Sequence, residues 1–248
     1  MPLVLSAEHY GDALVRHAEK AAPRFADVAA AKVPYLPMGV FFSEALSLAA
    51  AIDMVNATHF IESGTAQGQS TELLARYFVG KPLQITTIDR DTLYHLYKQT
   101  KKRLAQFPSV MCIKGNSFEM IPRQLGALGP SDRAVVFIDG PKGRLGVKLA
   151  LESLAHPRVA LVAVHDTAAV WNKKIYTDLL AHNETVLMTS EPAYRQRFRH
   201  FDAQHNEKAV LKKLYKEKGW EKSKIPPILE FGNGVWFAGR TPLARLQV

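Results

Sequence analysis

The sequence predicts an α/β fold: a doubly wound, mostly parallel seven-stranded sheet, preceded by N-terminal helices and with a basic insertion before the last strand. Short apolar runs without polar alternation are typical of strands buried on both faces, and helical stretches separate these runs. The connections are short, and no internal repeat interrupts the order. With 248 residues, 47% of them hydrophobic and 22% charged, the chain can bury the core of one large domain.

The N-terminal part is expected to be helical. Apolar residues recur at helical spacing until Pro23, Pro34 and Pro37 break the pattern. A second amphipathic helix is predicted over 41–55, with Ser43 as its N-cap.

From there strands and helices alternate. The predicted strands cover 59–61, 83–88, 110–113, 134–138, 159–164, 185–188 and 234–238. The predicted helices between them cover about 70–78, 92–107 and 147–155.

Composition excludes several classes of protein. A lone Cys112 excludes a disulfide framework and a cysteine-based zinc site, and it fits a reducing compartment. No apolar run approaches the roughly 20 residues that cross a bilayer, and the N-terminus lacks the basic start of a signal peptide. We therefore expect a cytoplasmic protein with no membrane partner. The formal charge of +9 is compatible with nucleic acid, an anionic substrate or solubility alone.

Acidic or small polar residues end five of the predicted strands. They are Glu62, Asp89, the segment 115–117, Asp139 and Asp166. In an open α/β sheet, ligands bind outside the carboxyl ends of the strands, where the strand order reverses. Any one of these residues could simply cap the next helix, but five at one sheet edge favour a binding site.

The turn after the first predicted strand, 62–71, contains two glycines and a Ser-Thr pair that can cap the next helix. It lacks the lysine and the spacing of a phosphate-binding loop, and Ala66 stands where a dinucleotide fingerprint needs its second glycine. Asp89 follows Gly68 by 21 residues and is well placed to accept both hydroxyls of a ribose. A carboxylate at Glu62 suits a cationic ligand. A nucleoside with a cationic tail and no phosphate is S-adenosylmethionine.

These motifs resemble the class I S-adenosylmethionine-dependent methyltransferases, over roughly 40–190 and the last strand. The spacing of Glu62, Gly64, Gly68 and Ser70 is similar to that of the catechol and caffeoyl-CoA O-methyltransferases. The segments Phe137-Ile138-Asp139-Gly140 and Val164-His165-Asp166-Thr167 resemble the sugar and macrolide O-methyltransferases.

The resemblance implies a Rossmann-like methyltransferase fold and a set of cofactor contacts. Glu62 and Gly64, in the turn with Gly68 and Ser70, would hold the methionine end of the cofactor. Asp89 would hold the ribose. The adenine would be bordered by Asn116 and Ser117.

Methyl transfer to oxygen needs a base, or a metal that lowers the pKa of the hydroxyl. Asp139 and Asp166 are candidate ligands for Mg²⁺ or another hard divalent cation. In the catechol-type family a lysine base follows the first acid by three residues, and Lys142 has that spacing. Thr167 stands where that family has an asparagine ligand, so the set is one strong ligand short. His165 is a further candidate base or ligand. As an alternative, Lys142 is a solvated loop charge or an anion-binding group.

A basic segment follows. Residues 171–224 hold twelve Lys and Arg against seven Asp and Glu, with aromatic residues between them. Three interpretations stay open: the solvated face of an amphipathic helix, a lid over an anionic small substrate, or a surface for single-stranded nucleic acid.

We predict one methyltransferase domain, 1–248. Its parts are N-terminal helices (1–55), a cofactor-binding core (56–190), a basic insertion or lid (191–230), and the last strand with its tail (231–248). The expected reaction is O-methylation of a small molecule or glycan, with metal assistance as an option. The alternatives are an RNA-modifying methyltransferase that uses 195–224, and a cofactor-binding scaffold without catalysis. Homo-oligomers are compatible with the sequence.

Overall fold

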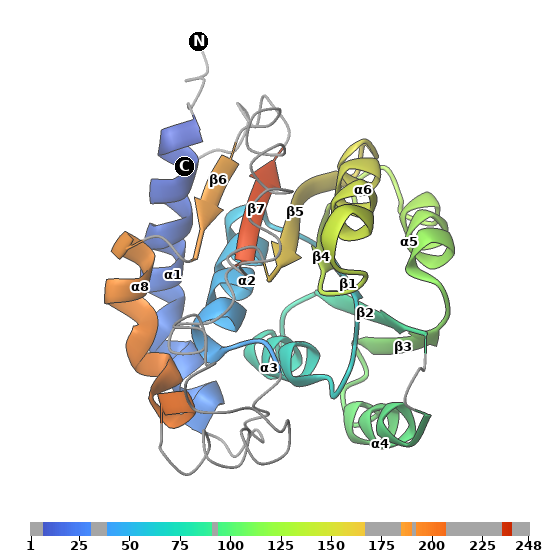
Figure 1. Ribbon diagram of the computed structural model, residues 1–248, viewed down its shortest axis with the longest axis horizontal. Coiled ribbons are helices and arrows are strands. Elements are labelled where there is room, and N and C mark those ends of the chain that lie inside the picture. The colour runs from blue at the N-terminus through green and yellow to red at the C-terminus, as the bar shows by residue number, and fades with distance from the viewer. Residues whose placement is uncertain are drawn as a thin grey trace.

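The computed structural model describes residues 7–30, 39–90, 94–166, 185–189, 192–206 and 235–239. Within them, one seven-stranded sheet has the order β3-β2-β1-β4-β5-β7-β6 (Figure 1). The five parallel strands are β1 (His59–Ser63), β2 (Gln84–Asp89), β3 (Val110–Lys114), β4 (Ala134–Ile138) and β5 (Val159–His165). The antiparallel strands are β6 (Thr185–Met188) and β7 (Val235–Gly239), with β7 between β5 and β6.

Helices lie on both faces of this sheet (Figure 1). The helices are α1 (Ala7–Ala30), α2 (Phe42–Met54), α3 (Gln69–Tyr77), α4 (Tyr94–Leu104), α5 (Ser117–Gly126), α6 (Gly143–Leu154) and α8 (Pro192–Phe198), followed by the 3₁₀ helix η1 (Arg199–Asn206). The predicted doubly wound α/β class and its mostly parallel sheet are therefore confirmed.

Two hydrophobic cores, one on each face, hold the layers together. On one face Phe60 and Phe137 stack with ring centroids 6.2 Å apart and pack with side chains of α1, α2 and α3. On the other face Ile61, Val136 and Ile138 pack against α5 and α6. Neighbouring residues of one strand thus feed opposite cores, as the alternation of side chains along a strand requires. Every residue of β4 is buried, which explains its continuous apolar run.

The prediction that Pro23 breaks the first helix is wrong, because α1 continues through it to Ala30. The helical periodicity on either side supplies buried Leu14, Ala18 and Phe25, so packing offsets the hydrogen bond that a proline cannot donate. None of the helices in the described part of the chain is long and apolar enough to cross a membrane.

The predicted caps of two helices also differ. Phe41, not Ser43, is the N-cap of α2, and the Ser43 hydroxyl donates to Asp202 at 2.5 Å. Gly68 is the N-cap of α3, in a left-handed conformation with φ +68°, so Ser70 lies inside the helix. In both helices the predicted hydroxyl binds a buried carboxylate and not its own helix end.

The basic insertion is only partly described. Its residues 192–206 form α8 and η1, where Tyr194 and Phe198 are buried. Residues 207–234 lie outside the described residues, and with them most of the predicted lysine-rich face.

Candidate active site

The carboxyl ends of the five parallel strands lie along one edge of the sheet. The chain runs outward from β1 to β3 and then returns to β4 on the other side of β1. This reversal between β1 and β4 is the position where doubly wound sheets bind ligands. The structure thus gathers the polar strand ends that the sequence singled out.

A cavity of about 210 Å³ opens at this reversal. It is lined by residues at the ends of four strands or just after them: Gly64, Ile88, Asp89, Arg90, Asn116, Ser117, Gly140 and Pro141. Four of the seven predicted cofactor-binding residues are among them. Sequence reasoning missed the other four, Ile88, Arg90, Gly140 and Pro141, although each lies within two residues of a predicted strand-end acid.

Gly64 brings the β1 and β4 sides of the cavity together. Its φ is +97°, and a Cβ atom there would lie 2.9 Å from the backbone nitrogen of Gly140. The backbone nitrogens of Asp139 and Gly140 both donate to the Ser63 carbonyl, at 2.8 and 2.9 Å. Only glycine fits this crossing, because backbone and not a flexible side chain fills the place of a Cβ.

Glu62 is fully buried beneath the turn and does not line the cavity. Its two carboxylate oxygens accept hydrogen bonds from the hydroxyls of Ser70, Thr71 and Thr87. Burial raises the pKa of Glu62 to about 7, although the three hydroxyls lower it. The side chain therefore ties β1, α3 and β2 together, and its predicted contact with the methionine end of a cofactor stays a prediction.

Gly68 has a structural reason of its own. A Cβ atom at this position would meet the side chain of Thr100 at 2.7 Å and that of Leu104 at 3.1 Å. The glycine thus permits close packing of the turn on α4. Gly68 and Ser70 do not line the cavity described above.

Asp89 lies at the end of β2 and on the cavity wall. Its Oδ2 atom accepts a hydrogen bond from the backbone nitrogen of Ala66 at 2.9 Å, which fixes the carboxylate against the glycine turn. Across the cavity, Asn116 caps α5 through the backbone nitrogen of Phe118 and accepts from the Arg90 guanidinium at 3.0 Å. An anchored carboxylate opposite polar side chains can bind the hydroxyls and the ring of a nucleoside.

A charged cluster begins where the cavity ends. Asp139 precedes Gly140, and Lys142 follows it at the N-cap of α6. The Lys142 ammonium contacts the carboxylates of both Asp139 and Asp166. Burial alone raises the pKa of Asp139, but the charges of Lys142 and His165 outweigh it and hold this pKa well below its usual value.

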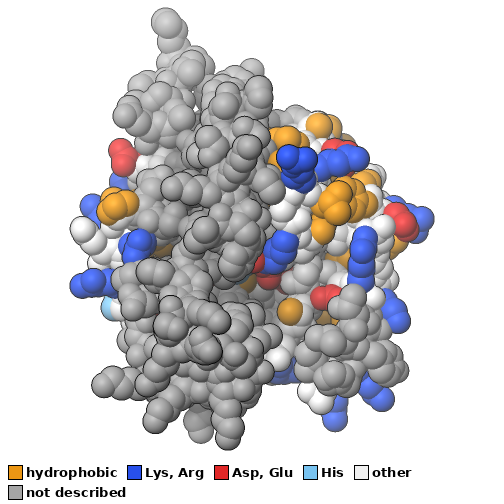
Figure 2. Space-filling model, viewed as in Figure 1, with side chains coloured by type: hydrophobic (Ala, Val, Ile, Leu, Met, Phe, Trp, Pro, Cys, Tyr) orange, Lys and Arg blue, Asp and Glu red, His pale blue; other side chains and the backbone are white. Residues whose placement is uncertain are grey.

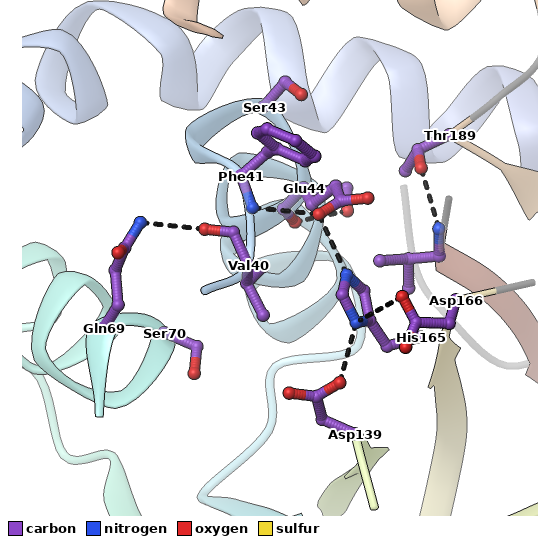
Figure 3. A network of polar contacts seen from close by, with 12 residues as sticks. Val40, Phe41, Ser43, Glu44, Gln69, Ser70, Asp139, His165, Asp166 and Thr189 are labelled. Atoms are coloured by element: carbon purple, nitrogen blue, oxygen red, sulfur yellow. Dashed lines mark hydrogen bonds and ion pairs between the residues drawn. The ribbon is translucent and has the colours of Figure 1, made fainter. Parts of the chain in front are cut away.

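His165 lies at the centre of the cluster, with 6% of its side chain exposed (Figure 3). Its Nδ1 atom is 2.7 Å from Asp139 Oδ1 and 3.4 Å from Asp166 Oδ1, and its Nε2 atom is 3.0 Å from Glu44 Oε2. Burial lowers the pKa of His165, but the surrounding carboxylates raise it well above the ordinary value. Both ring nitrogens thus face a carboxylate, one on each side of the ring.

Glu44 is a residue of this site that the sequence analysis missed. It lies in the first turn of α2, is 1% exposed, and also accepts from the backbone nitrogen of Phe41 at 2.9 Å (Figure 3). The capping-box position of a glutamate three residues after the N-cap is its only local signal. Its contact with His165 spans 121 residues of sequence, a distance over which sequence spacing carries no information.

The start of α2 has a second buried acid. Asp202 of η1 accepts from the backbone nitrogen of Ser43 at 3.0 Å and from its hydroxyl, so it caps α2 from a distant part of the chain. Burial raises the pKa of Asp202 to about 7, although the bonds from Ser43 lower it. The Tyr194 hydroxyl donates to the Ser43 carbonyl at 2.9 Å. The helix that carries Glu44 is thus held by residues near the other end of the chain.

No protein-family model matches the chain, and no curated protein matches it. Solved structures do. A putative caffeoyl-CoA O-methyltransferase from Staphylococcus aureus is 19% identical, with 78% of this chain and 80% of that chain covered and a TM-score of 0.43. An O-methyltransferase from Bacillus cereus in complex with S-adenosylhomocysteine is 16% identical, with 91% of each chain covered and a TM-score of 0.47.

A third similar structure is the O-methyltransferase TomG from Streptomyces achromogenes, which is involved in tomaymycin synthesis and was solved with S-adenosylmethionine. It is 18% identical, with 90% of this chain and 88% of that chain covered and a TM-score of 0.44. Because the likeness is distant, the case for a function depends on the residues of this chain.

Proposed function

We propose that this chain is an S-adenosylmethionine-dependent O-methyltransferase that acts on a hydroxyl of a small molecule or glycan. The observation that carries the proposal is the position of Asp89. Its carboxylate is fixed against the glycine turn on the wall of a cavity, and the same wall contains Gly140, the residue after Asp139 of the charged cluster. Asp89 would hold the hydroxyls of a nucleoside there, and Gly64 and Gly140 would line the same cavity.

The charges at the sheet edge favour a cationic nucleoside over a nucleotide. Ser70 and Thr71, which could bind a phosphate at the start of α3, donate instead to the buried Glu62. Asp89 and Asp139 add carboxylates on either side of the turn. A phosphate would face these acids without the lysine that a phosphate-binding loop supplies, whereas a sulfonium would be attracted by them.

The cofactor supplies an activated methyl group, so the protein has to align the acceptor oxygen and accept its proton. Burial lowers the pKa values of Lys142 and His165, but the neighbouring acids raise both above their usual values. In the proposed reaction these two residues act as cations, and the Asp166 carboxylate accepts the hydroxyl proton. The oxygen–carbon bond forms as the carbon–sulfur bond breaks, and the electron pair of the broken bond stays on sulfur.

Calorimetry with S-adenosylhomocysteine tests the first half of the proposal, with ATP and NAD⁺ as controls. We expect saturable binding of S-adenosylhomocysteine alone, and binding of only ATP or NAD⁺ would contradict the assignment. Transfer of a tritiated methyl group to phenolic, sugar and carboxylated acceptors tests the second half. Transfer to RNA only would favour the RNA-modifying alternative. Cofactor binding without transfer to any acceptor would favour a scaffold.

A further inference from the structure

The strand ends of β4 and β5 hold the donor set that a divalent cation would use. One ligand atom from each of Asp139, His165 and Asp166 lies within 4.8 Å of the others. Two carboxylates at this separation suit Mg²⁺ or Mn²⁺. The resemblance to catechol-type enzymes implies such an ion, so the fit of these residues to a metal can be tested on their contacts. Thr167, at the place of the third ligand in that family, lies outside the described residues.

The place between the two carboxylates is taken by Lys142. Its ammonium contacts Oδ1 of Asp139 and Oδ2 of Asp166, so it bridges the same two groups that an ion would bridge. The lysine ammonium is a compact point charge with three donors and can serve two carboxylates at once. A divalent cation would have to displace it, because two cations cannot share these oxygens without strong repulsion.

His165 does not offer a lone pair to a metal in this arrangement. Its two ring nitrogens face carboxylates on opposite sides, Glu44 at 3.0 Å and Asp139 at 2.7 Å (Figure 3). Both ring nitrogens therefore already face a carboxylate, and a metal could bind one of them only by displacing that carboxylate. A metal at this edge would therefore have to displace the Lys142 ammonium and also one of the two contacts of His165.

The charges of the five residues alternate along the contacts: Glu44, His165, Asp139, Lys142, Asp166. The Lys142 ammonium compensates part of the negative charge of Asp139 and Asp166, so the two carboxylates attract a divalent ion less than a bare acidic site would. The residues present do not fit a metal site as they are arranged.

We propose that the ammonium of Lys142 replaces a divalent cation between Asp139 and Asp166, and that the chain works without a metal at this edge. The part that Lys142 would play in a reaction rests on the proposed function. Lys142 keeps 45% of its side chain exposed, so an acceptor oxygen can approach the ammonium from solvent. There it would receive the hydrogen bond that lowers the pKa of a hydroxyl, as a metal would.

Direct binding of Mn²⁺, followed by electron paramagnetic resonance, tests this proposal without turnover. We expect no saturable site in the wild-type chain at millimolar Mn²⁺. In Lys142→Met, which keeps the length of the side chain and removes its charge, we expect affinity for Mn²⁺ to rise by about a hundredfold or more. Lys148→Met is the matched control, since this lysine is exposed on the same helix and lies 3.7 Å from Glu152. It should bind as weakly as the wild type.

Two results would overturn the proposal. One is a single saturable Mn²⁺ site in the wild type that Asp166→Asn abolishes. The other is a folded Lys142→Met variant, by thermal unfolding, that gains no affinity. If Lys142→Met does not fold, Lys142→Gln takes its place with the same expectation. Binding of S-adenosylhomocysteine is measured on the same samples. If the wild type does not bind S-adenosylhomocysteine, the proposed function is wrong. The Mn²⁺ measurement still decides whether Lys142 takes the place of a divalent cation.

Discussion

The two halves of the binding edge deal with buried charge in opposite ways. In the half built on β1, α3 and β2, Glu62 is surrounded by hydroxyls and its pKa rises to about 7, so it loses its charge near neutral pH. In the half built on β4, β5 and α2, Asp139 contacts Lys142 and His165 and its pKa falls, although burial opposes this. Uncharged donors let a buried acid be neutralised by a proton, whereas cations keep it ionised.

The two halves therefore differ in role: the first holds the turn in place, and the second would supply charge to the proposed reaction. A neutral, hydrogen-bonded acid can hold a turn in place but supplies no field. A chain of alternating ions supplies a field at the point where a reaction would need it.

The helix face next to the charged half also carries exposed apolar residues, Leu145 and Leu151 of α6, and hydrophobic side chains show over this helix in Figure 2. Exposed apolar side chains on one helix are ordinary at the protein surface and need no partner.

The largest expected effect is on the pH dependence of stability. The contrast between the two halves would fail if the pKa of Glu62 were lowered, as that of Asp139 is. Because the pKa of Glu62 is raised, the native state binds more protons than the unfolded state, and stability falls as pH rises from below 5 to above 7. Between pH 5 and 8 we expect the wild type to lose about 2 to 3 kcal/mol more of its free energy of unfolding than Glu62→Gln. Urea denaturation at both pH values measures this.

Asp202→Asn is the matched variant for the same measurement, because the pKa of Asp202 is also raised to about 7. It should remove a loss of similar size and the same sign. Asp139 does not contribute in this window: its lowered pKa gives stability that is present above its unfolded value and is lost only at lower pH. Equal pH slopes for Glu62→Gln and the wild type would refute the assignment of Glu62.

The next effect concerns the crossing that joins the two halves. Gly64→Ala places a Cβ atom 2.9 Å from the backbone of Gly140 at a φ of +97°. We expect the free energy of unfolding to fall by about 2 to 3 kcal/mol, with loss of binding to S-adenosylhomocysteine, because the backbone on both sides has to shift.

Gly140→Ala is the control for that variant. Its added Cβ would meet only the Cα atom of Gly64, at 3.8 Å, which is an ordinary contact. We expect a cost below about 1 kcal/mol. Thermal unfolding and calorimetry on both variants decide the matter, and equal effects would show that the close approach is not what requires a glycine at 64.

A smaller effect belongs to Asp89 alone. Removing the carboxylate in Asp89→Ala should weaken S-adenosylhomocysteine by about 1.5 to 3 kcal/mol, or roughly tenfold to a hundredfold, since hydrogen bonds to a charged group are lost. Asp89→Asn keeps a side-chain oxygen that accepts from the Ala66 backbone nitrogen. Its affinity for S-adenosylhomocysteine should therefore lie between those of the wild type and Asp89→Ala. Unchanged affinity in Asp89→Ala by calorimetry would remove Asp89 from the proposed cofactor site.

The smallest expected effect is the contribution of Arg90 to the binding of S-adenosylhomocysteine. Arg90 lies on its wall and donates to Asn116 at 3.0 Å, in an exposed contact. Arg90→Ala should weaken S-adenosylhomocysteine by less than about 1 kcal/mol, because exposed polar contacts contribute little. Calorimetry with S-adenosylhomocysteine, as for the Asp89 variants, measures this affinity. A loss as large as that of Asp89→Ala would mean that the guanidinium, and not the carboxylate, dominates binding.

The sequence predicted which strand ends meet, and four of the seven predicted cofactor-binding residues line the cavity. The glycine spacing, the strand-end Asp89 and the pair at 116–117 are local patterns, and parallel strands bring them to one edge without further information. The same logic predicted that Asp139 and Asp166 would meet. It missed Glu44, because a contact between α2 and β5 depends on how a helix packs across the sheet, which no spacing records.

The misassigned caps have the same origin. Ser43 and Ser70 have the residue type of an N-cap, and local preference favours that role. Each instead binds a buried carboxylate from another element, Asp202 and Glu62. An unpaired buried acid costs more free energy than a missing cap, so tertiary contacts overrule local preference here.

The long-range anchoring of α2 has a consequence during synthesis on the ribosome. Twelve of its thirteen residues are buried, yet its partners His165 and Asp202 follow 121 and 159 residues after the residues they hold. At roughly 5–20 residues per second, the nascent helix waits on the order of ten seconds before these partners are translated. We therefore expect the segment 42–54 to be a preferred site for chaperones on the growing chain, and the charged half of the edge to assemble last.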